Sequence, residues 1–377
     1  MSKKVLLVAT VQSHIAQFHK PLINMLHEAG YEIHVAARNN LSEKNGLSID
    51  EADKVFDVPF ARSPYTPKNI TAYKELKAIV NQNNYEIVHC NTPVGGILTR
   101  LACRKHRKEK KTKVIYQAHG FHFYKGAPLK NWLLYYPLEK IFAKLTDDLI
   151  TINTEDYEFA KQKMKTNVHI VHGVGADSSR YNTEDVSGLR EELGLSEKDF
   201  VILCVGELNK NKNQIKILEA LSSMDTANIK MLFAGNGPTR DELLQYTNEH
   251  GLADVVEFLG YRLDLHRYVK ASDLVVSMSI REGLGLNIIE AMMCEKPVVV
   301  SDNRGHRELS KDGLGGYMVN SDDNKGLAQK IECMLNDRDS CAQMGTFNLK
   351  LSEKYKKESV VLELKNIYGL QRENGKI

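Results

Sequence analysis

The sequence lacks several features that would assign it to a specialised class of protein. No apolar run approaches about 18 residues, so we expect no helix that crosses a membrane, and the opening Met1-Ser2-Lys3-Lys4 leads into a strand rather than an export signal. The net charge of +3 on 377 residues is nearly balanced, which argues against a dedicated nucleic-acid binder. We therefore expect a cytoplasmic protein with no nucleic-acid partner.

Paired cysteines and acidic metal motifs are also missing. The six cysteines include no C-x-x-C pair and mostly lie in apolar surroundings, so they predict buried thiols in a reducing compartment. The sequence contains no D-x-D motif and no His/Cys cluster with metal-ligand spacing. We therefore expect no disulfide framework, no bound metal and no cofactor.

The first half alternates strand-like and helix-like segments, which is typical of a parallel sheet covered by helices. A first βαβ unit is expected from a strand at 5–9, a helix at 17–29 that ends at Gly30, and a strand at 32–37. Further strands are expected at 55–58, 86–91, 113–118, 149–152 and 168–171, and helices near 70–82, 95–105, 129–144 and 155–165.

A second series of the same kind follows a linker at 173–199, for which we expect one short helix. Its strands are expected at 200–205, 229–234, 255–259, 274–276, 297–301 and 317–320, and its helices at 213–223, 239–250, 287–294 and 325–335. The sequence therefore predicts two doubly wound, Rossmann-like parallel-sheet domains (α/β) that face each other across a cleft. We expect one domain at 1–176, a second at 177–350, and a C-terminal helix within 351–377 that packs back on the first domain.

The segment 281–290, R-E-G-L-G-L-N-I-I-E, follows an apolar strand-like run and carries the most informative motif. Gly283 and Gly285 let the backbone pass close to a ligand, and the helix that follows points its free amides at an anion. Glu282 and Glu290 flank this anion site, and because carboxylates repel phosphate, we expect them to accept hydrogen bonds from hydroxyls on either side of it. A nucleotide sugar has such hydroxyls at both ends, whereas an exposed loop with ordinary glutamates is the alternative.

Two other strands of the second half end in glycine-bearing loops. The loop after 200–205 reads G-E-L-N-K-N-K-N and places Lys212 where it can meet a phosphate charge. The next strand is followed by G-N-G-P at 235–238, whose glycines permit close approach of the backbone. Lys212 alone could be a solvated lysine, but the carboxyl ends of parallel strands meet at one edge, which favours a shared ligand site.

The order V-G-E-L-N-K-N-K-N, A-G-N-G-P, F-L-G-Y-R and R-E-G-L-G-L-N-I-I-E resembles the donor domain of family 4 glycosyltransferases of the GT-B fold. Glu282 and Glu290 match the Glu-x7-Glu motif of that family. The resemblance implies that 1–176 is the acceptor-binding domain and that 177–350 is the nucleotide-sugar donor-binding domain. The segments A-T-V-Q-S-H, H-V-A-A and Q-A-H-G-F resemble its bacterial exopolysaccharide and capsule branch. The likeness implies retaining transfer of a hexose or N-acetylhexosamine, from a nucleotide sugar that is expected to be UDP-linked, to a hydroxyl of a polyprenyl-diphosphate-linked saccharide.

The resemblance also implies roles for individual residues. Three are expected to be catalytic: Lys212 pairs with the diphosphate, Glu282 takes hydroxyls of the donor sugar, and His119 faces that sugar across the cleft. A satisfied polar residue at a strand end is the alternative for His119. The donor-binding residues are then Glu290 at the ribose, together with Gly206, Asn236, Gly237, Leu259, Gly260, Tyr261, Arg281, Gly283, Leu284, Gly285 and Leu286. Ser13, His14 and His122 form the expected acceptor region, and His122 is a rival of His119.

One position departs from the family pattern. Many members carry Arg five residues before the phosphate lysine, where this chain has Glu207, and a carboxylate cannot replace a guanidinium at a phosphate. Either Arg281, Arg262 or Lys210 supplies the second charge, or Lys212 and the helix amides suffice.

The expected mechanism follows from the charge that develops on the departing diphosphate. Lys212 and the start of the helix at 287–294 would stabilise that charge without a metal, and the acceptor would attack on the face that the phosphate leaves. Two alternatives remain open: a UDP-sugar epimerase or hydrolase of the same fold, and a non-catalytic nucleotide-sugar-binding subunit.

A basic cluster at 104–113 carries seven Lys or Arg against one Glu. It precedes 128–137, which includes the only tryptophan, Trp132, beside Tyr135 and Tyr136. Basic and aromatic side chains together predict a peripheral enzyme at the anionic inner face of the cell membrane. A solvated loop followed by an ordinary core helix is the alternative.

Overall fold

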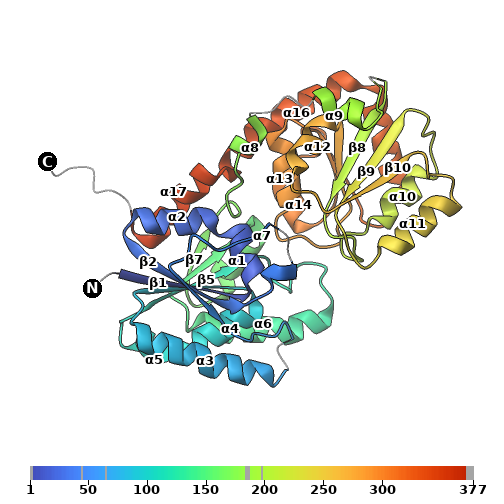
Figure 1. Ribbon diagram of the computed structural model, residues 1–377. Helices are drawn as coiled ribbons and strands as arrows, with labels where there is room; N and C mark the ends of the chain where they lie inside the picture. Colours follow the sequence, from blue (N-terminus) through green and yellow to red (C-terminus); the bar gives the residue numbers. More distant parts are fainter. Residues whose placement is uncertain (1–2, 44–45, 64–65, 183–186, 197, 371–377) are drawn as a thin grey trace. The chain divides into compact units, whose positions relative to one another are not determined.

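Figure 1 shows the computed structural model, which describes residues 3–43, 46–63, 66–182, 187–196 and 198–370. The described chain divides into two compact units: 3–175 with 357–370 form the first, and 176–356 form the second. Both units consist of a parallel sheet with helices on its faces, so the predicted pair of α/β domains is confirmed.

The first unit is built on a seven-stranded sheet in the order β3-β2-β1-β4-β5-β6-β7, and all its pairings are parallel. Its strands are β1 (Lys3–Val11), β2 (Tyr31–Arg38), β3 (Lys54–Asp57), β4 (Ile87–Asn91), β5 (Lys113–Ala118), β6 (Asp148–Thr151) and β7 (Asn167–Ile170). The strand order reverses between β1 and β4, and such a switch point is where ligands bind in this kind of sheet.

Helices cover both faces of this sheet. They are α1 (Gln12–Phe18), α2 (Lys20–Glu28), α3 (Lys68–Asn83), α4 (Pro93–Ala102), α5 (Arg104–Lys108), α6 (Leu129–Ala143), α7 (Thr154–Lys163) and α17 (Lys357–Tyr368), with a short 3₁₀ turn η1 (Leu41–Glu43). Successive residues of β1 alternate between the two cores. Val5 and Leu7 pack with α1, α2 and α17, whereas Leu6 and Val8 pack with α3, α4 and α7.

The helix predicted at 17–29 is wrong in its start and in its continuity. The chain turns into α1 directly after β1, and α1 ends before His19, whose φ and ψ of −118° and 9° are not helical. Pro21 causes the break, because its ring fixes φ and it has no N–H to donate to the preceding turn, so it can only open a new helix.

The helix predicted at 95–105 is likewise divided into two. It begins earlier, as α4, with Pro93 in its first turn, and Cys103 separates it from α5. The basic residues of 104–108 therefore form a short helix of their own, in which no residue is buried.

The second unit has a six-stranded parallel sheet in the order β10-β9-β8-β11-β12-β13, so its order reverses between β8 and β11. The strands are β8 (Phe200–Val205), β9 (Ile229–Ala234), β10 (Val256–Gly260), β11 (Leu274–Ser277), β12 (Val298–Ser301) and β13 (Gly316–Val319). The helices are α8 (Ser179–Asn182), α9 (Ser187–Glu192), α10 (Ile215–Leu221), α11 (Arg240–Glu249), α12 (Leu265–Ala271), α13 (Leu286–Met293), α14 (Arg304–Leu309), α15 (Asn324–Asn336) and α16 (Arg338–Ser352), followed by η2 (Glu353–Tyr355).

The sequence did not predict α12, α14 and α16, and the linker holds two short helices, α8 and α9, instead of one. Helix α16 lacked an apolar pattern because its buried face includes Gly345, Asn348 and Ser352. The amide nitrogen of Asn348 donates there to the carbonyls of Lys296 and Gly315, at 2.9 and 2.6 Å.

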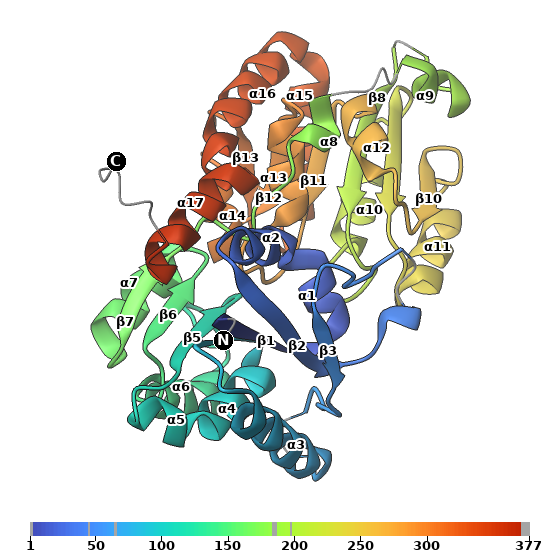
Figure 2. The ribbon, with the colours of Figure 1, turned by 60° about the vertical axis from the view of Figure 1, so that its left-hand side comes forward.

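The chain returns to the first unit at its C-terminal end. Helix α17 lies beside α2, as both ribbon views show, and the Tyr368 hydroxyl is hydrogen-bonded to His89 of β4 (Figure 2). Glu363 accepts from the backbone N–H of His172 at 2.9 Å and meets its Nδ1 at 2.6 Å. Residues 371–377, part of the predicted C-terminal segment, lie outside the described residues.

Among the described residues, no helix combines the length and the apolar character needed to cross a membrane.

Candidate active site

The loops that follow four strands of the second unit are joined by backbone hydrogen bonds. Gly235 N–H donates to the carbonyl of Gly260 at 2.8 Å, and Leu208 N–H donates to that of Asn236 at 3.0 Å. Ile280 N–H donates to the carbonyl of Asn211 at 2.7 Å. The loops after β8, β9, β10 and β11 therefore meet at one edge of the sheet, and β8 and β11 flank the switch point.

Glycines allow these loops to approach each other. A Cβ atom on Gly235 would lie 2.0 Å from the carbonyl oxygen of Gly206, and one on Gly237 would lie 2.2 Å from that of Leu208. Gly206 itself has φ +153°, and the side chain of Lys212 lies over it, since a Cβ there would be 3.2 Å from Lys212 Cε. Any side chain at Gly206 would therefore push Lys212 away from the strand end.

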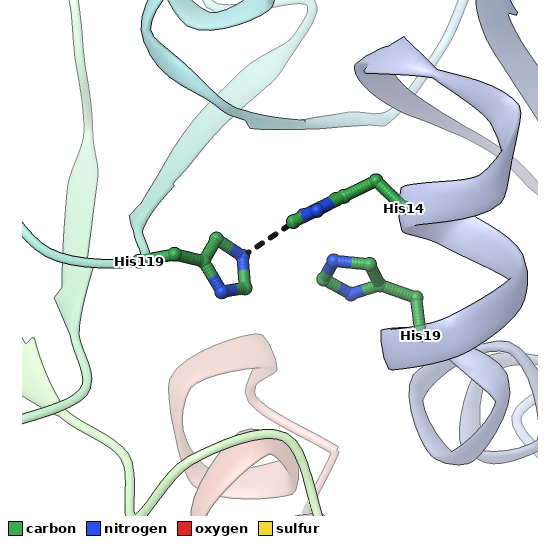
Figure 3. A group of neighbouring side chains, drawn as sticks. All are labelled: His14, His19 and His119. Carbon is green, nitrogen blue, oxygen red and sulfur yellow. Dashed lines mark hydrogen bonds between the residues drawn. The ribbon is translucent and has the colours of Figure 1, made fainter. Parts of the chain in front are cut away.

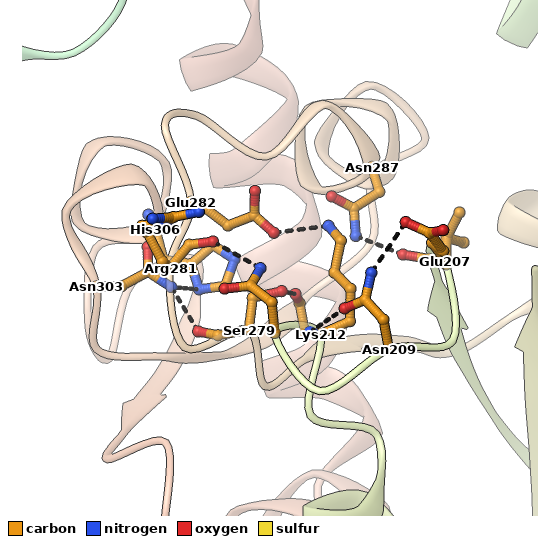
Figure 4. Close-up of polar contacts among 12 residues, drawn as sticks. Glu207, Asn209, Lys212, Ser279, Arg281, Glu282, Asn287, Asn303 and His306 are labelled. Atoms are coloured by element: carbon orange, nitrogen blue, oxygen red, sulfur yellow. Dashed lines mark hydrogen bonds and ion pairs between the residues drawn. The ribbon is translucent and has the colours of Figure 1, made fainter. Parts of the chain in front are cut away.

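Lys212 and Glu282 form an ion pair at this edge. The distance from Lys212 Nζ to Glu282 Oε1 is 2.6 Å, and both side chains are mostly buried (Figure 4). Their positions in the sequence are 70 residues apart, so the pair exists because the loops after β8 and β11 are neighbours. An ammonium and a carboxylate are thus held together beside the switch point.

Glu207, at the position that departs from the family pattern, supports the lysine loop without contacting the ammonium group. Its Oε2 accepts from the side-chain amide of Asn209 at 2.9 Å, and Asn209 Oδ1 accepts from the backbone N–H of Lys212 at 2.9 Å. Glu207 therefore orients the amide that fixes the loop at Lys212 (Figure 4).

Helix α13 begins next to this ion pair and has an open N-terminus. Its N-cap is Gly285, which makes no side-chain cap, and the first turn has no acidic residue. The side chain of Asn287 donates to the carbonyl of Val205 at 3.0 Å, which fixes the helix start against the end of β8. Unsatisfied N–H groups and the helix dipole make such a terminus a binding site for an anion.

The other expected donor residues follow the same loops. Glu290 is the fifth of the eight residues of α13 and is partly buried. Gly283 is partly exposed, Leu284 is 9% exposed, and Leu286 is the first residue of the helix. After β10, Gly260 has φ +68° and lies against Asn236, Leu259 is half-buried, and Tyr261 is 55% exposed.

The structure narrows the choice of a second cation. Arg262 donates Nε and Nη2 to the two carboxylate oxygens of Asp264, at 2.8 and 2.7 Å, and its guanidinium lies over the ring of Tyr268. It is therefore engaged elsewhere, whereas Arg281 and Lys210 are exposed at the loops that surround Lys212.

His306, on α14, is a residue of this site that the sequence reasoning missed. It is buried, and its Nδ1 lies 2.8 Å from the carbonyl of Ser301 and 2.9 Å from the side-chain amide nitrogen of Asn303. Its Nε2 is also buried and has no hydrogen-bond partner among the described residues. The ring lies next to the start of α13, because a Cβ on Gly285 would be 3.6 Å from it. Burial lowers the pKa of His306 to about 4, so its imidazole is neutral beside the expected anion site. Only its place directly after a strand end signalled it in the sequence.

In the first unit, His119 and His14 come together. His119 follows β5, and its Nε2 lies 3.3 Å from Nε2 of His14 and 3.0 Å from Oδ1 of Asn91 (Figure 3). Burial lowers the pKa of His14 to about 4 and that of His119 well below its usual value. Both rings are therefore neutral at physiological pH.

Ser13 and His122 have other partners. Ser13 Oγ accepts from the side chain of Asn40 at 2.9 Å, and its N–H donates to Asn40 Oδ1 at 3.0 Å, so it anchors the start of α1. His122 stacks on Tyr135 of α6, with 4.5 Å between ring centroids. Of the predicted acceptor residues, His14 is the one found beside His119.

Residues 4–153 match the model of a family described as "Glycosyl transferase 4-like", and 185–350 match "Glycosyl transferases group 1". EpsD of Bacillus subtilis (strain 168), named as a glycosyltransferase, is 39% identical over 376 residues, which cover 98% of this chain and 97% of that protein. UDP-Gal:alpha-D-GlcNAc-diphosphoundecaprenol alpha-1,3-galactosyltransferase of Escherichia coli is 28% identical over 290 residues, or 73% of each chain. The crystal structure of Anabaena Alr3699/HepE in complex with UDP and glucose has a TM-score of 0.79 and 19% identity, over 98% of this chain and 100% of that one.

Two Rossmann-like sheets and these matches define a glycosyltransferase of the GT-B fold class. The chain belongs to family 4 of the glycosyltransferases.

Proposed function

We propose that the enzyme transfers a hexose or an N-acetylhexosamine from a UDP-sugar, with retention, to a hydroxyl of a polyprenyl-diphosphate-linked saccharide in exopolysaccharide or capsule synthesis. The Lys212–Glu282 pair beside the open start of α13 carries the proposal, because it combines groups for a diphosphate with one for sugar hydroxyls. Two similar proteins add support. The E. coli relative is named as a transferase that uses UDP-Gal and a diphosphoundecaprenol-linked sugar, and the Anabaena structure is a complex with UDP.

The ion pair assigns a different end of the donor to each partner. A diphosphate at the start of α13 would compete with Glu282 for the ammonium of Lys212, so that Lys212 turns to the phosphate. Glu282 would then be free to accept hydrogen bonds from the hydroxyls of the sugar, and Glu290, farther along α13, from those of the ribose. His119, as a neutral imidazole, would donate to or accept from the sugar without adding charge.

Bond cleavage places negative charge on the leaving diphosphate, which Lys212 and the α13 amides stabilise. Removing one such donor typically costs about 10²–10³-fold in rate. We assign no carboxylate among the described residues of the site as a nucleophile, because we place Glu282 at the sugar hydroxyls and Glu290 at the ribose, and Glu207 is hydrogen-bonded to Asn209. An acceptor that attacks on the side of the departing phosphate therefore accounts for retention.

The proposal makes transfer independent of a divalent cation, because the lysine and the helix start neutralise the diphosphate. We expect the rate of transfer in about 5–10 mM EDTA to be no lower than the rate in buffer alone. This EDTA concentration is roughly a thousandfold above that of trace metal. Release of UDP measured with and without added Mg²⁺ tests this. A rate that falls more than about tenfold in EDTA and is restored by Mg²⁺ would contradict it.

We also propose a peripheral position at the anionic inner face of the cell membrane, with contact residues that differ from those predicted. Trp132 and Tyr136 pack on Phe123 and Phe159 in the core, so these aromatics are not free to enter a membrane interface. The same helix, α6, instead exposes apolar side chains to solvent: Leu129 at 72%, Leu133 at 71%, Leu134 at 40% and Ile141 at 57%.

The basic cluster adjoins this helix. Arg107 of α5 pairs with Asp147 at 3.0 Å and donates to the carbonyl of Lys144 at the end of α6. The exposed lysines of the cluster thus belong to a segment that contacts the C-terminal end of α6, the helix that exposes the apolar side chains. Anionic lipid attracts each basic residue near its surface by about 1 kcal/mol.

We expect the enzyme to sediment with vesicles that contain anionic lipid and to be released by salt, which screens exposed charges beyond about 10 Å at 0.1 M. Replacing four exposed lysines by Ser should abolish sedimentation but spare activity on a water-soluble acceptor analogue: Lys105, Lys108, Lys110 and Lys111. Arg107 is kept because it is a structural partner of Asp147. The charge-matched control removes four exposed lysines of the second unit: Lys198, Lys311, Lys325 and Lys350. Equal sedimentation of both variants would assign the cluster to solvent.

A screen of UDP-Glc, UDP-Gal, UDP-GlcNAc and UDP-GalNAc tests the function itself. Binding of one donor, and UDP release only when a polyprenyl-diphosphate-linked saccharide is present, would support the proposal. Epimer formation or UDP release without acceptor would favour an epimerase or hydrolase. Binding without turnover across the acceptors would favour a non-catalytic subunit.

A further inference from the structure

Three histidines from different segments of the first unit surround one point. His14 lies on α1, His19 lies at the break between α1 and α2, and His119 follows β5. Each offers a ring nitrogen, and these three nitrogens lie within 4.8 Å of one another (Figure 3). The sequence predicted His14 and His119 as separate site residues. Because they are 105 residues apart in the sequence, no motif indicated that they form a cluster.

The spacing of the nitrogens suits a metal ion. Two nitrogens that each lie about 2.0–2.1 Å from a tetrahedral Zn²⁺ stand roughly 3.3–3.4 Å apart. The observed distance between Nε2 of His14 and Nε2 of His119 is 3.3 Å. The third ring, at most 4.8 Å away, can close on the same ion by a small rotation of its side chain.

The chemical state of the rings also favours a metal. Metal ligation requires a neutral imidazole, and burial keeps the pKa of all three histidines low, to about 4 for His14 and well below the usual value for the others. No proton has to be lost at neutral pH before these lone pairs can bind. Imidazole ligands select Zn²⁺, Ni²⁺ or Cu²⁺ over Mg²⁺ or Ca²⁺.

Unsatisfied nitrogens provide a second, independent observation. Nε2 of His19 is buried and has no hydrogen-bond partner among the described residues, and the same holds for Nε2 of the neighbouring His89. A buried polar atom without a partner costs about 1–3 kcal/mol, so a ligand at this point would satisfy a group that the fold leaves open. The ring centroids of His19 and His89 are 5.9 Å apart, and Nδ1 of His89 is hydrogen-bonded to the hydroxyl of Tyr368.

We propose that His14, His19 and His119 form a binding site for a divalent transition-metal ion such as Zn²⁺, with a fourth position open to a water or an anionic oxygen. On binding, the Nε2 hydrogen that His119 now directs at Asn91 moves to Nδ1, so the ring stays neutral. The proposal goes beyond glycosyl transfer, for which we propose no metal. Since His119 is the residue we place at the donor sugar, the bound ion removes it from that role and inhibits transfer.

Co²⁺ provides a direct probe, because its visible absorption reports coordination by nitrogen. Full-length enzyme without a histidine tag, stripped with EDTA and carrying Cys333→Ser to remove the one described cysteine that is exposed, is titrated with CoCl₂. We expect one equivalent to bind with the intense visible bands of a four- or five-coordinate site, and Zn²⁺ to displace it. Calorimetry with Zn²⁺ should give the same stoichiometry.

Ligand variants decide the assignment. His19→Ala and His14→Ala should each weaken Zn²⁺ binding by about 10²-fold, at or above the 10–100-fold lost when an outer-shell partner of a metal site is removed. His250→Ala, an exposed histidine of the second unit, should change it less than twofold. Thermal melting and UDP affinity verify folding, and if one variant fails to fold, His119→Ala takes its place. Two results would overturn the proposal. One is no binding at 1 mM metal, a concentration roughly a thousandfold above the Kd expected of a functional site. The other is an unchanged Zn²⁺ affinity in the folded variants.

An activity measurement separates regulation from binding. Saturating Zn²⁺ should lower the rate of transfer at least about tenfold, and EDTA should restore it, whereas His19→Ala should keep its own metal-free rate in the same Zn²⁺ concentration. Zn²⁺ that binds without lowering the rate would refute the inhibitory role while leaving the site. The binding experiments need no substrate, so a failure of the proposed transferase function would not affect them.

Discussion

Glu282→Ala is expected to lower the rate of transfer by about 10²-fold or more while UDP binds at least as tightly as to the wild type. Hydrogen bonds to a charged group contribute about 1.5–3 kcal/mol each, and the variant would lose those to the sugar hydroxyls in the transition state. UDP itself should gain, because the carboxylate at 2.6 Å no longer competes with its diphosphate for Lys212. Calorimetry for UDP and an assay of UDP release measure the two effects.

Two further variants complete this test. Glu290→Ala should weaken UDP binding itself by roughly tenfold, since we place it at the ribose, and Glu242→Ala, on the exposed face of α11, should alter neither quantity. Equal loss of UDP affinity in Glu282→Ala and Glu290→Ala, with folding verified by thermal melting, would show that the two carboxylates do not serve opposite ends of the donor.

Lys212→Met is expected to reduce both UDP affinity and the rate of transfer. Met keeps most of the stem that lies over Gly206 but removes the charge, so the diphosphate loses its main cation. We expect the Kd for UDP to rise at least about tenfold and the rate to fall about 10²–10³-fold, the range seen for loss of one preorganised donor at a developing negative charge. The effect on the rate exceeds that on binding because the charge on the phosphate grows in the transition state.

Lys210→Met is the matched control for that variant. Lys210 lies in the same loop and carries the same charge, but it is exposed to solvent. A surface charge contributes about 0–1 kcal/mol, so we expect at most about a fivefold change in UDP affinity. If Lys210→Met lost as much as Lys212→Met, the second charge of the site would come from Lys210, and Arg281 would lose its place as a candidate.

The sequence predicted the strands best where they are buried on both faces. The bounds expected for β5, β8 and β9 agree with the structure residue for residue, because a central parallel strand is a continuous apolar run between polar ends. The helices were predicted less accurately. Helix α2 is separate from α1 because Pro21 forces a new start, and α16 was missed because its buried face includes small and polar residues. A pattern of apolar residues does not reveal a buried polar side chain whose amide nitrogen donates to neighbouring carbonyls.

The glycine loops of the donor site were predictable, but its contacts were not. Strand ends that meet at one edge follow from a parallel sheet, and Gly206 and Gly235 were recognised because a tight approach requires glycine. That Lys212 pairs with Glu282 depends on how two loops 70 residues apart face each other. His306 was missed because no motif marks a buried histidine that the segment after β12 places beside Gly285 at the start of α13.

Glu207 shows why one substitution is hard to interpret from sequence. By sign alone, a carboxylate could not take the place of the guanidinium that many family members carry near the phosphate. In the fold it accepts from Asn209, which in turn holds the backbone of Lys212, so it contributes by positioning the loop rather than by charge.

The measurement that tests the central claim most directly is the proton NMR spectrum of the product formed from the UDP-sugar that binds and a polyprenyl-diphosphate-linked saccharide. Wild-type enzyme should release UDP only with acceptor present and should form a new linkage whose anomeric coupling constant shows the α configuration of the donor, and Glu282→Ala should form about a hundredth of it or less. A β linkage, or UDP release that proceeds equally without acceptor, would contradict retaining transfer at the Lys212–Glu282 site.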